Sequence, residues 1–544
     1  MIIPQPVPPD KRPLIRYAVF FIFIFTAAET ALPQEHISRN RSFEIIRYSV
    51  DIEINDSSDI INGNTGIELV LLQDIEEAVI NLAAKRSDGR GMVVDSILID
   101  GRTVDHRHED DMLFIPVDEN AAGDTLTYVI FYQGEPGDGL IISNNIYGDR
   151  TFFTDNWPDR AHNWFPCLDH PSGRTLVDFT ITAPSRYQVI ATGLLRKRVN
   201  LSGSRTTHYW TSAVPVPTKV MAFAAAEFAV EFNGDINGIP YSNWVYPRNM
   251  EEGFRFFSPT PEVLEFFVGL FGPYPFEKIA NVQSTTRYGG MENAGNIFYN
   301  EQTVAEGGAG ELTIVHEMAH QWFGNSLTET DWPHLWISEG IATWLTDRYV
   351  EQMYGKMELD ARLIKHRQRI IEFTGKRLVP VVDHHPERLT DLLNPNSYEK
   401  GSWILHMLRR KIGEQVLVGG LVEFYHRYKP GNASTDDLRM VLEEVSGINL
   451  EEFFDDWLYS AGHPVLSVNS AFGNGRLTLE LVQMQQHKMA FSFPLDIRFV
   501  FENGSSLDQT FDILFRRHEF ILDMDSEPVE IIIDPDLWLL FEQR

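Results

Sequence analysis

The sequence predicts a multi-domain α+β protein that starts with an all-β domain, continues with a mainly helical domain and ends with a β-sandwich. Two observations predict this order. Near both ends of the chain, apolar and polar residues alternate over short runs, which is typical of half-buried strands. In the middle, apolar residues recur every three to four positions, as in amphipathic helices. The length of 544 residues exceeds what one hydrophobic core supports and suggests three or four domains.

Residues 1–31 are predicted to be a targeting segment. Basic residues precede an apolar run of 12 residues from Tyr17 to Ala28, and Thr26-Ala27-Ala28 offers a small-residue cleavage site. The run is short for a membrane span but fits the apolar part of a signal peptide. We therefore expect an exported protein that is periplasmic, secreted or facing outward from a membrane. An uncleaved segment that tethers the chain to a membrane is the alternative.

Residues 32–233 are predicted to form the all-β domain. Period-two runs such as Ser49–Asn55 and Val177–Thr182 alternate there with turn residues, and the domain is expected to end near a turn at Asn233-Gly234.

Residues 234–462 are predicted to form the mainly helical domain. Helical periodicity is clearest over Pro261–Leu270, Leu312–Phe323, Ile337–Met353, Ser402–Leu408 and Asp436–Val445.

Residues 463–544 return to short alternating runs and are predicted to form a small β-sandwich. Its expected strands include Leu477–Leu481, Leu495–Val500 and Val529–Ile533.

The formal net charge of −31 limits the choice of partners. An acidic surface favours solubility and disfavours nucleic acid and anionic membranes, so we expect no nucleic-acid partner. Cys167 is the single cysteine, so the chain has no internal disulfide and its redox compartment stays open.

A candidate metal site begins with His316-Glu317-Met318-Ala319-His320, in a segment predicted to be helical. Two His residues four positions apart share one helix face, so both imidazoles can reach one metal ion. Glu317 lies off that face, where it can take a proton from a metal-bound water, as in H-E-x-x-H zinc hydrolases. The alternative is a helix with two His residues at a packed or solvated surface.

Glu339 follows His320 after 18 intervening residues and is expected to supply a third ligand from a second helix. Two His and one Glu leave the fourth zinc position open for water, as a catalytic site requires. A structural zinc site would close the shell, usually with several cysteines, whereas Cys167 is the single cysteine of this chain. The sequence therefore predicts one catalytic Zn²⁺ per chain, although another divalent ion could substitute in vitro.

The stretch from Val315 to Trp344 resembles the aminopeptidase N family of zinc metallopeptidases, the gluzincins with H-E-x-x-H-x18-E. Two further motifs match that family. They are G-x-M-E-N at Gly289-Gly290-Met291-Glu292-Asn293 and Y-x-K-G at Tyr398-Glu399-Lys400-Gly401. The resemblance covers nearly the whole chain after the N-terminal segment. It implies a β-saddle domain, a thermolysin-like catalytic domain and a β-sandwich, without the large C-terminal helical domain of many relatives.

The resemblance implies a zinc aminopeptidase acting on peptides with a free N-terminus. Glu292 would bind the substrate α-amine, within a substrate-binding segment that also includes Met291 and Asn293. Gly289 and Gly290 would let its backbone edge approach the substrate as an added strand.

The resemblance also implies roles at the scissile bond. Zinc would lower the pKa of its water toward ~7, and Glu317 would take the proton and pass it to the leaving amine. Tyr398 would donate its hydroxyl to the oxyanion of the tetrahedral intermediate.

One region departs from the family pattern. Many members have a Gln or Glu shortly before the segment that is Pro166-Cys167-Leu168-Asp169 here, and that residue assists in amine binding. The family spacing leads to Trp157. Asp155 nearby could fill the role, and a turn residue is the equal alternative for it.

Three rival functions remain open at this point. A bifunctional epoxide hydrolase like leukotriene A4 hydrolase is opposed by the β-patterned C-terminal region, and a thermolysin-type endopeptidase by the G-x-M-E-N match. A catalytically silent peptide-binding protein would usually have lost a ligand or the base. The preferred N-terminal residue, the physiological peptides and the oligomeric state do not follow from the sequence.

Overall fold

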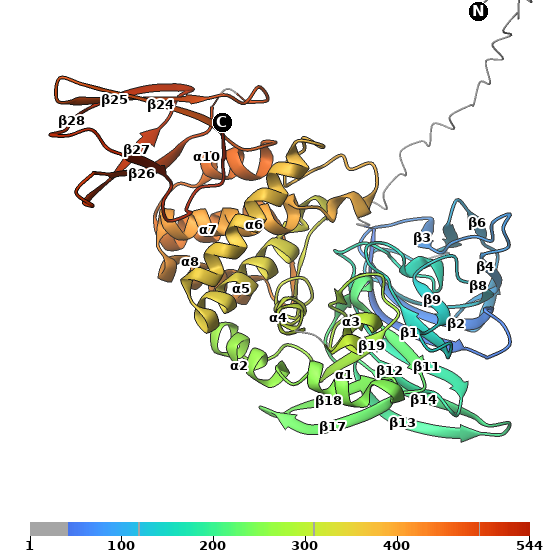
Figure 1. Cartoon of the computed structure of the whole chain (residues 1–544). Coiled ribbons are helices and arrows are strands. Elements are labelled where there is room, and N and C mark those ends of the chain that lie inside the picture. Colours follow the sequence, from blue (N-terminus) through green and yellow to red (C-terminus); the bar gives the residue numbers. More distant parts are fainter. Residues whose placement is uncertain (1–41, 118–119, 308–309, 489) are drawn as a thin grey trace, which may run out of the picture. The chain divides into compact units, whose positions relative to one another are not determined.

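The computed structural model describes residues 42–117, 120–307, 310–488 and 490–544 (Figure 1). The predicted targeting segment lies outside these residues. None of the helices in the described part of the chain combines the length and hydropathy of a membrane span.

The N-terminal region consists of β-sheets. Its largest sheet has nine strands, in which β15 pairs beside a path of eight strands. The path runs β13 (Leu194–Leu201), β14 (Arg205–Thr211), β11 (Arg174–Pro184), β1 (Phe43–Glu53), β2 (Ile61–Leu71), β8 (Thr125–Glu135), β4 (Gly91–Ile99) and β5 (Arg102–Val104), and β15 is Val216–Pro217. Alternate residues of β11 are buried, as its period-two sequence predicts.

Two smaller sheets complete this region. One has the order β3 (Glu77–Asn81), β7 (Met112–Pro116) and β6 (Arg107–Glu109). The other has the order β12 (Gln188–Ala191), β16 (Phe223–Ala226), β10 (Arg150–Thr154) and β9 (Leu140–Asn144).

A five-stranded sheet opens the middle region, where the sequence pattern predicted mainly helices. Its order is β17 (Ala229–Ile236), β18 (Ile239–Val245), β19 (Ile279–Ser284), β21 (Asn296–Asn300) and β20 (Gly290–Met291). Every residue of β19 is buried, so this strand shows no alternation. This complete burial explains why the pattern missed β19.

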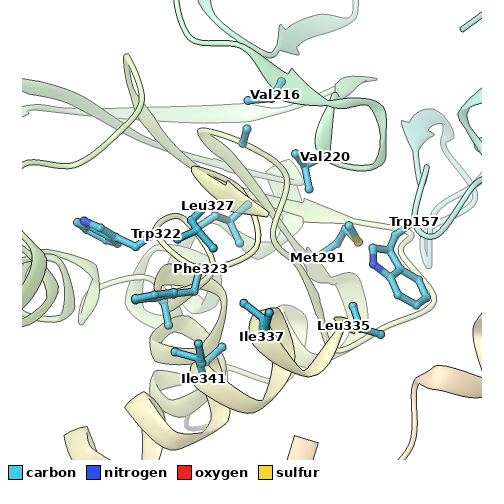
Figure 2. Packing of buried hydrophobic residues seen from close by; sticks show 14 of the residues in the cluster. Trp157, Val216, Val220, Met291, Trp322, Phe323, Leu327, Leu335, Ile337 and Ile341 are labelled. Carbon is cyan, nitrogen blue, oxygen red and sulfur yellow. The ribbon is translucent and has the colours of Figure 1, made fainter. Parts of the chain in front are cut away.

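Helices make up the rest of the middle region (Figure 1). They are α1 (Met250–Phe256), α2 (Thr260–Phe271), α3 (Glu301–Glu306), α4 (Glu311–Ala319), α5 (Trp336–Tyr354), α6 (Lys356–Thr374), α7 (Gly401–Ile412), α8 (Glu414–Tyr428), α9 (Thr435–Ser446) and α10 (Glu451–Phe454). Two short strands, β22 (Leu327–Glu329) and β23 (Gly431–Ala433), pair in parallel among them. Figure 2 shows Trp322, Phe323 and Leu327, from the segment after α4, in one buried cluster with Ile337 and Ile341 of α5.

Two sheets form the C-terminal region. One has the order β28 (Arg517–Asp523), β25 (Arg476–Gln483), β24 (Val465–Gly473) and β30 (Glu542–Gln543). The other has the order β27 (Ser506–Ile513), β26 (Phe493–Val500) and β29 (Glu530–Ile533). The predicted fold class, with β-rich, helical and β-rich regions in that order, is confirmed, while the domain limits at 233 and 462 stay predictions.

The turn predicted at Asn233-Gly234 is wrong. β17 continues through both residues, and its register with β18 shifts there, as at a β-bulge. The chain reverses instead at Asn237 and Gly238, with φ values of 54° and 81°. Positive φ at both central residues is what a two-residue hairpin turn requires, and Asn-Gly meets it.

Buried polar contacts join the N-terminal region to the middle region. The Lys219 ammonium, 1% exposed, pairs with the Glu329 carboxylate, 0% exposed. Arg174, at the start of β11, donates to the carbonyl oxygen of Asn325 at 2.8 Å. Removing one partner of such a buried ion pair typically costs about 3–5 kcal/mol, so this contact is sensitive to single substitutions.

Lys278 makes a second connection between the two regions. Its buried ammonium donates to the carbonyl oxygens of Ala191 at 2.8 Å and Gly193 at 2.5 Å. No carboxylate within ion-pair distance of it is found among the described residues. Burial lowers the pKa of Lys278 to about 7.

The Lys278→Met variant should weaken the pH dependence of stability. The pKa of Lys278 is lower in the folded than in the unfolded state, so its contribution to stability rises with pH between about 7 and 10.5. From pH 7 to pH 9 this contribution is on the order of 2 kcal/mol. Urea unfolding at both pH values should show a larger gain for the wild type than for the variant. Equal gains would contradict the burial of a titrating ammonium.

Candidate metal and peptide site

His316 and His320 face a common point from the end of α4. α4 ends at Ala319, and His320 follows it with helical φ and ψ, so the two rings lie one turn apart. Their Nε2 atoms are 3.1 Å from each other. Glu339, near the start of α5, places Oε2 3.4 Å from Nε2 of His316 and 3.3 Å from Nε2 of His320. The structure thus brings together the three predicted ligands.

These separations suit a tetrahedral metal ion. Bonds of about 2.0–2.1 Å at tetrahedral angles place the ligand atoms about 3.3–3.4 Å apart. The three observed separations lie within 0.3 Å of that range, because they run from 3.1 to 3.4 Å. A group of two imidazoles and one carboxylate is also the ligand type that catalytic zinc prefers.

The His320 ring is held by its other nitrogen. Nδ1 lies 3.1 Å from the carbonyl oxygen of Phe323 and 3.2 Å from Oγ of Ser338. A carbonyl partner requires a proton on Nδ1, which leaves Nε2 as the lone-pair donor toward a metal. Burial opposes the charged form of both rings. The Glu339 carboxylate outweighs this for His320, raising its pKa to about 10 without a metal, whereas the pKa of His316 is lowered. A metal ion would displace the proton from Nε2 of His320, because a ligating imidazole must be neutral.

Glu317 lies beside the ligands, with its side chain against Gly290. A Cβ atom on Gly290 would lie 2.3 Å from Oε1 of Glu317. Burial raises the pKa of the Glu317 carboxyl well above its ordinary value. The carboxylates of Glu292 and Glu339 act in the same direction, and His320 opposes them.

Glu292 is buried, and its Oε1 makes no hydrogen bond within the described residues. Its backbone carbonyl, by contrast, accepts from Nε2 of Gln321 at 2.8 Å and from Nδ2 of Asn325 at 2.6 Å. Gln321 also accepts from the Tyr274 hydroxyl and the Gly295 amide, each at 3.1 Å. Sequence reasoning missed Gln321 and Asn325, although both lie within five residues of His320.

The motif segment 289–293 lies at an edge of the five-stranded sheet of the middle region. β20, formed by Gly290 and Met291, pairs with β21 and is the last strand of that sheet. Its outer backbone groups are therefore placed to pair with an added strand. Asn293 is buried, and its side-chain amide has no hydrogen-bond partner within the described residues.

Tyr398 lies in a turn of π-helix, Asn396–Lys400, that leads into α7. Its ring stacks on His316 with centroids 6.0 Å apart. Burial raises the pKa of the Tyr398 hydroxyl well above its ordinary value, and the carboxylates of Glu339, Glu292 and Glu317 add to the effect. Lys400 of the same motif donates to the carbonyl oxygen of Gly462 at 2.7 Å, which anchors the turn.

Asp155 is not brought into the site. Its buried carboxylate pairs with Arg160 at 2.6 Å, and it is not among the residues that line the cavity at the candidate ligands. Trp157, to which the family spacing led, does line that cavity. Its ring meets Tyr288 edge to face at 6.5 Å. The structure therefore pairs Asp155 with Arg160 and leaves it out of the lining of the cavity.

A cavity of about 440 Å³ surrounds the candidate ligands. Its lining includes the ligands, Glu292, Glu317, Tyr398 and three basic residues of α6, Arg362, His366 and Arg369. A larger cavity of about 860 Å³ lies between α2, α5 and α8 but contains none of the motif residues.

Comparison with known proteins places these motifs in a family. The peptidase M1 N-terminal domain matches residues 45–220, and the peptidase family M1 domain matches residues 257–457.

The chain belongs to peptidase family M1.

The resemblance to the aminopeptidase N family is thereby confirmed. Similar M1 proteins include a glutamyl aminopeptidase of Bitis rhinoceros, 28% identical over 65% of this chain and 39% of that protein. A glutamyl aminopeptidase of Bos taurus is 30% identical over 58% of this chain and 35% of that protein. A probable M1 family aminopeptidase of Encephalitozoon cuniculi is 25% identical over 77% of this chain and 52% of that protein. The matched part of the chain thus spans about half or less of these relatives.

The Gly290→Ala variant of this M1 family member should fold, with the Glu317 carboxyl displaced. The added methyl would overlap the Glu317 carboxyl, the movable end of a side chain, so Glu317 shifts while the backbone stays. Under the aminopeptidase function proposed below, we expect at least a roughly 100-fold loss in kcat/KM, because misplacing a catalytic group typically costs about that much. Circular dichroism checks the fold. Gly269→Ala is the matched control, because a Cβ there meets no atom within 4 Å and Gly269, on α2, does not line the cavity. Full activity of Gly290→Ala would show that the contact with Glu317 is unimportant.

Proposed function

We propose that the protein is a zinc-dependent aminopeptidase that hydrolyses the N-terminal peptide bond of peptides. The observation that carries the proposal is the buried Glu292 carboxylate, whose Oε1 has no hydrogen-bond partner within the described residues. A buried carboxylate is costly unless it meets a cation, and a substrate ammonium is such a cation. An internal peptide bond offers no ammonium, so this group favours an exopeptidase.

Zinc would be held by His316, His320 and Glu339. When bound, it would polarise the scissile carbonyl and lower the pKa of a water molecule toward ~7. The spacing of the three donor atoms and the carbonyl partner of His320 Nδ1 support this choice.

The chain's own residues would position the substrate. Glu292 would receive the α-ammonium, and the free edge of β20 would pair with the peptide backbone. The hydrogen bonds of Gln321 and Asn325 to the Glu292 carbonyl would fix both groups relative to α4. Such fixed positioning supplies much of the rate enhancement of an enzyme.

Glu317 and Tyr398 would carry out the proton transfer and the charge stabilisation. Glu317 would take a proton from the attacking water on its carboxylate and deliver it to the leaving amine. Burial beside two other carboxylates strengthens Glu317 as a base, since it raises the pKa of the carboxyl. The Tyr398 hydroxyl stays protonated for the same reason and would donate to the oxyanion as negative charge develops there.

The Glu317→Gln variant should be inactive on a panel of aminoacyl-nitroanilides that the wild type cleaves. We expect at least a roughly 1000-fold loss in kcat, because both proton transfers depend on one carboxylate. Chelation should remove wild-type activity and added zinc should restore it. Glu306→Gln, at an exposed position of α3, is the matched control. If the panel is not cleaved although zinc is bound, epoxide hydrolysis or a binding role gains support.

The Glu292→Gln variant should lose discrimination for the free amine. Hydrogen bonds to charged groups contribute about 1.5–3 kcal/mol, so kcat/KM for unblocked peptides should fall roughly 10- to 100-fold. For the wild type, N-acetylated peptides should be poor substrates by a similar or larger factor. Liquid chromatography of paired free and acetylated peptides measures both effects. Equal cleavage of the two forms would point to an endopeptidase.

A further inference from the structure

One face of α6 brings two guanidinium groups and an imidazole into the cavity of the proposed peptidase. Arg362, His366 and Arg369 occupy positions i, i+4 and i+7 of the helix, and all three line the cavity. Arg369 is largely exposed at the rim, where it pairs with Glu399 at 2.5 Å. Arg362 and His366 are more deeply buried and lie beside Asp347 of α5.

Arg362 is anchored through one nitrogen only. Its Nε donates to Oδ1 of Asp347 at 2.7 Å, and Oδ2 of that carboxylate accepts from Oγ of Ser402 at 2.7 Å. Within the described residues the two terminal guanidinium nitrogens of Arg362 have no hydrogen-bond partner. A guanidinium fixed at one edge can still bind a carboxylate through the others.

His366 lies next to Arg362 and faces the same carboxylate. The residue is 8% exposed, and its Nδ1 lies 3.5 Å from Oδ2 of Asp347, within ion-pair distance. Its side chain also lines the cavity, where the ring can contact a ligand that Arg362 binds.

The distance between Arg362 and the scissile bond can be estimated along α5. Glu339, Thr343 and Thr346 of α5 all line the cavity, and Asp347 follows directly. Asp347 comes eight positions after Glu339, which corresponds to about 12 Å along the helix at 1.5 Å per residue. An extended peptide covers about 3.3–3.6 Å per residue. The Arg362 side chain extends toward the cavity, so the peptide has to span less than the full distance between Glu339 and Asp347. Arg362 is therefore within reach of a group one to three residues beyond the scissile bond.

We propose that Arg362, with His366, binds a carboxylate on the C-terminal side of the scissile bond, so that the preferred substrates are short peptides. The inference rests on the proposed aminopeptidase function. Glu292, which would receive the amine, lines the cavity together with Glu317 and Glu339, while Arg362 and His366 of α6 lie beside Asp347, two turns along α5 from Glu339. This charge pattern complements a short peptide with a free amine and a free carboxylate. An acidic side chain downstream of the scissile bond is the other source of the same chemistry.

The test compares matched tripeptides whose first residue is the one best cleaved in the nitroanilide panel. The second and third residues are Gly-Gly, with either a free carboxylate or a C-terminal amide, and further amides carry Asp at the second or third position. For the wild type we expect kcat/KM for the free acid to exceed that for the Gly-Gly amide roughly tenfold, which corresponds to about 1.4 kcal/mol.

Substitutions at Arg362 should reduce this preference. Arg362→Gln should bring the acid-to-amide ratio close to one while leaving the amide nearly unaffected. Arg362→Lys keeps a cation near Asp347 and should give an intermediate ratio, which preserves the test if the Gln variant fails to fold. Arg427→Gln is the matched control, because Arg427 lies on α8 and pairs with Glu423 and Glu444 instead.

The outcomes separate the two proposals. An acid preference that depends on Arg362 supports a terminal carboxylate as the ligand, and the same dependence confined to the Asp amides supports an acidic side chain. Equal kcat/KM values for the free acid, the Gly-Gly amide and the Asp-containing amides would overturn this inference. The proposed aminopeptidase function would still be supported, because all these peptides are cleaved. Failure to cleave any of these peptides would overturn the proposed function, and this inference with it.

Discussion

The hydrogen bonds of Gln321 hold the candidate site together. Its amide donates to the Glu292 carbonyl and accepts from Tyr274 and Gly295, so one buried side chain joins the segment after α4 to the loop that carries Glu292. Hydrogen bonds within a low-dielectric interior are strong, and leaving any of these groups unpaired would be costly. The distance between α4 and the Glu292 carboxylate, for which we propose amine binding, is therefore set by a buried side chain, and the loop backbone has little freedom to change it.

Burial of like charges gives this site its chemistry. Glu292, Glu317 and Glu339 share a small volume with two imidazoles, and burial raises the pKa of Glu317 in that volume. Three carboxylates in one low-dielectric pocket repel one another unless cations enter it. A divalent metal and a substrate ammonium, the two cations of the proposed function, would relieve this repulsion. The overall charge of −31 says little about this arrangement, because screening removes the influence of distant surface charges.

Much of the fold and of the ligand set could be predicted from the sequence, because both depend on spacing. The two His residues four apart and the alternation of β11 are local patterns, and the structure has both. Strand β19 of the five-stranded sheet could not be predicted, because it is buried throughout and its sequence does not alternate. Asn325 and Gln321 could not be assigned because their partner Glu292 is about thirty residues away and the contact is made through a backbone carbonyl. Asp155 has the residue type for amine binding, but its carboxylate pairs with Arg160 and does not line the cavity.

Two glycines explain how Tyr398 is placed relative to the third ligand. A Cβ atom on Gly340, directly after Glu339, would lie 3.0 Å from the Cα of Gly401, and a Cβ on Gly401 would lie 2.8 Å from the Cα of Gly340. The start of α5 and the turn that carries Tyr398 therefore pack backbone against backbone. Any side chain at either position would have to push Tyr398 away from Glu339, since the opposing atoms are main-chain atoms that cannot rotate aside. The glycine that ends Y-x-K-G is thus required by the distance between Glu339, a candidate metal ligand, and Tyr398, the proposed oxyanion donor, and it links two motifs separated by about sixty residues.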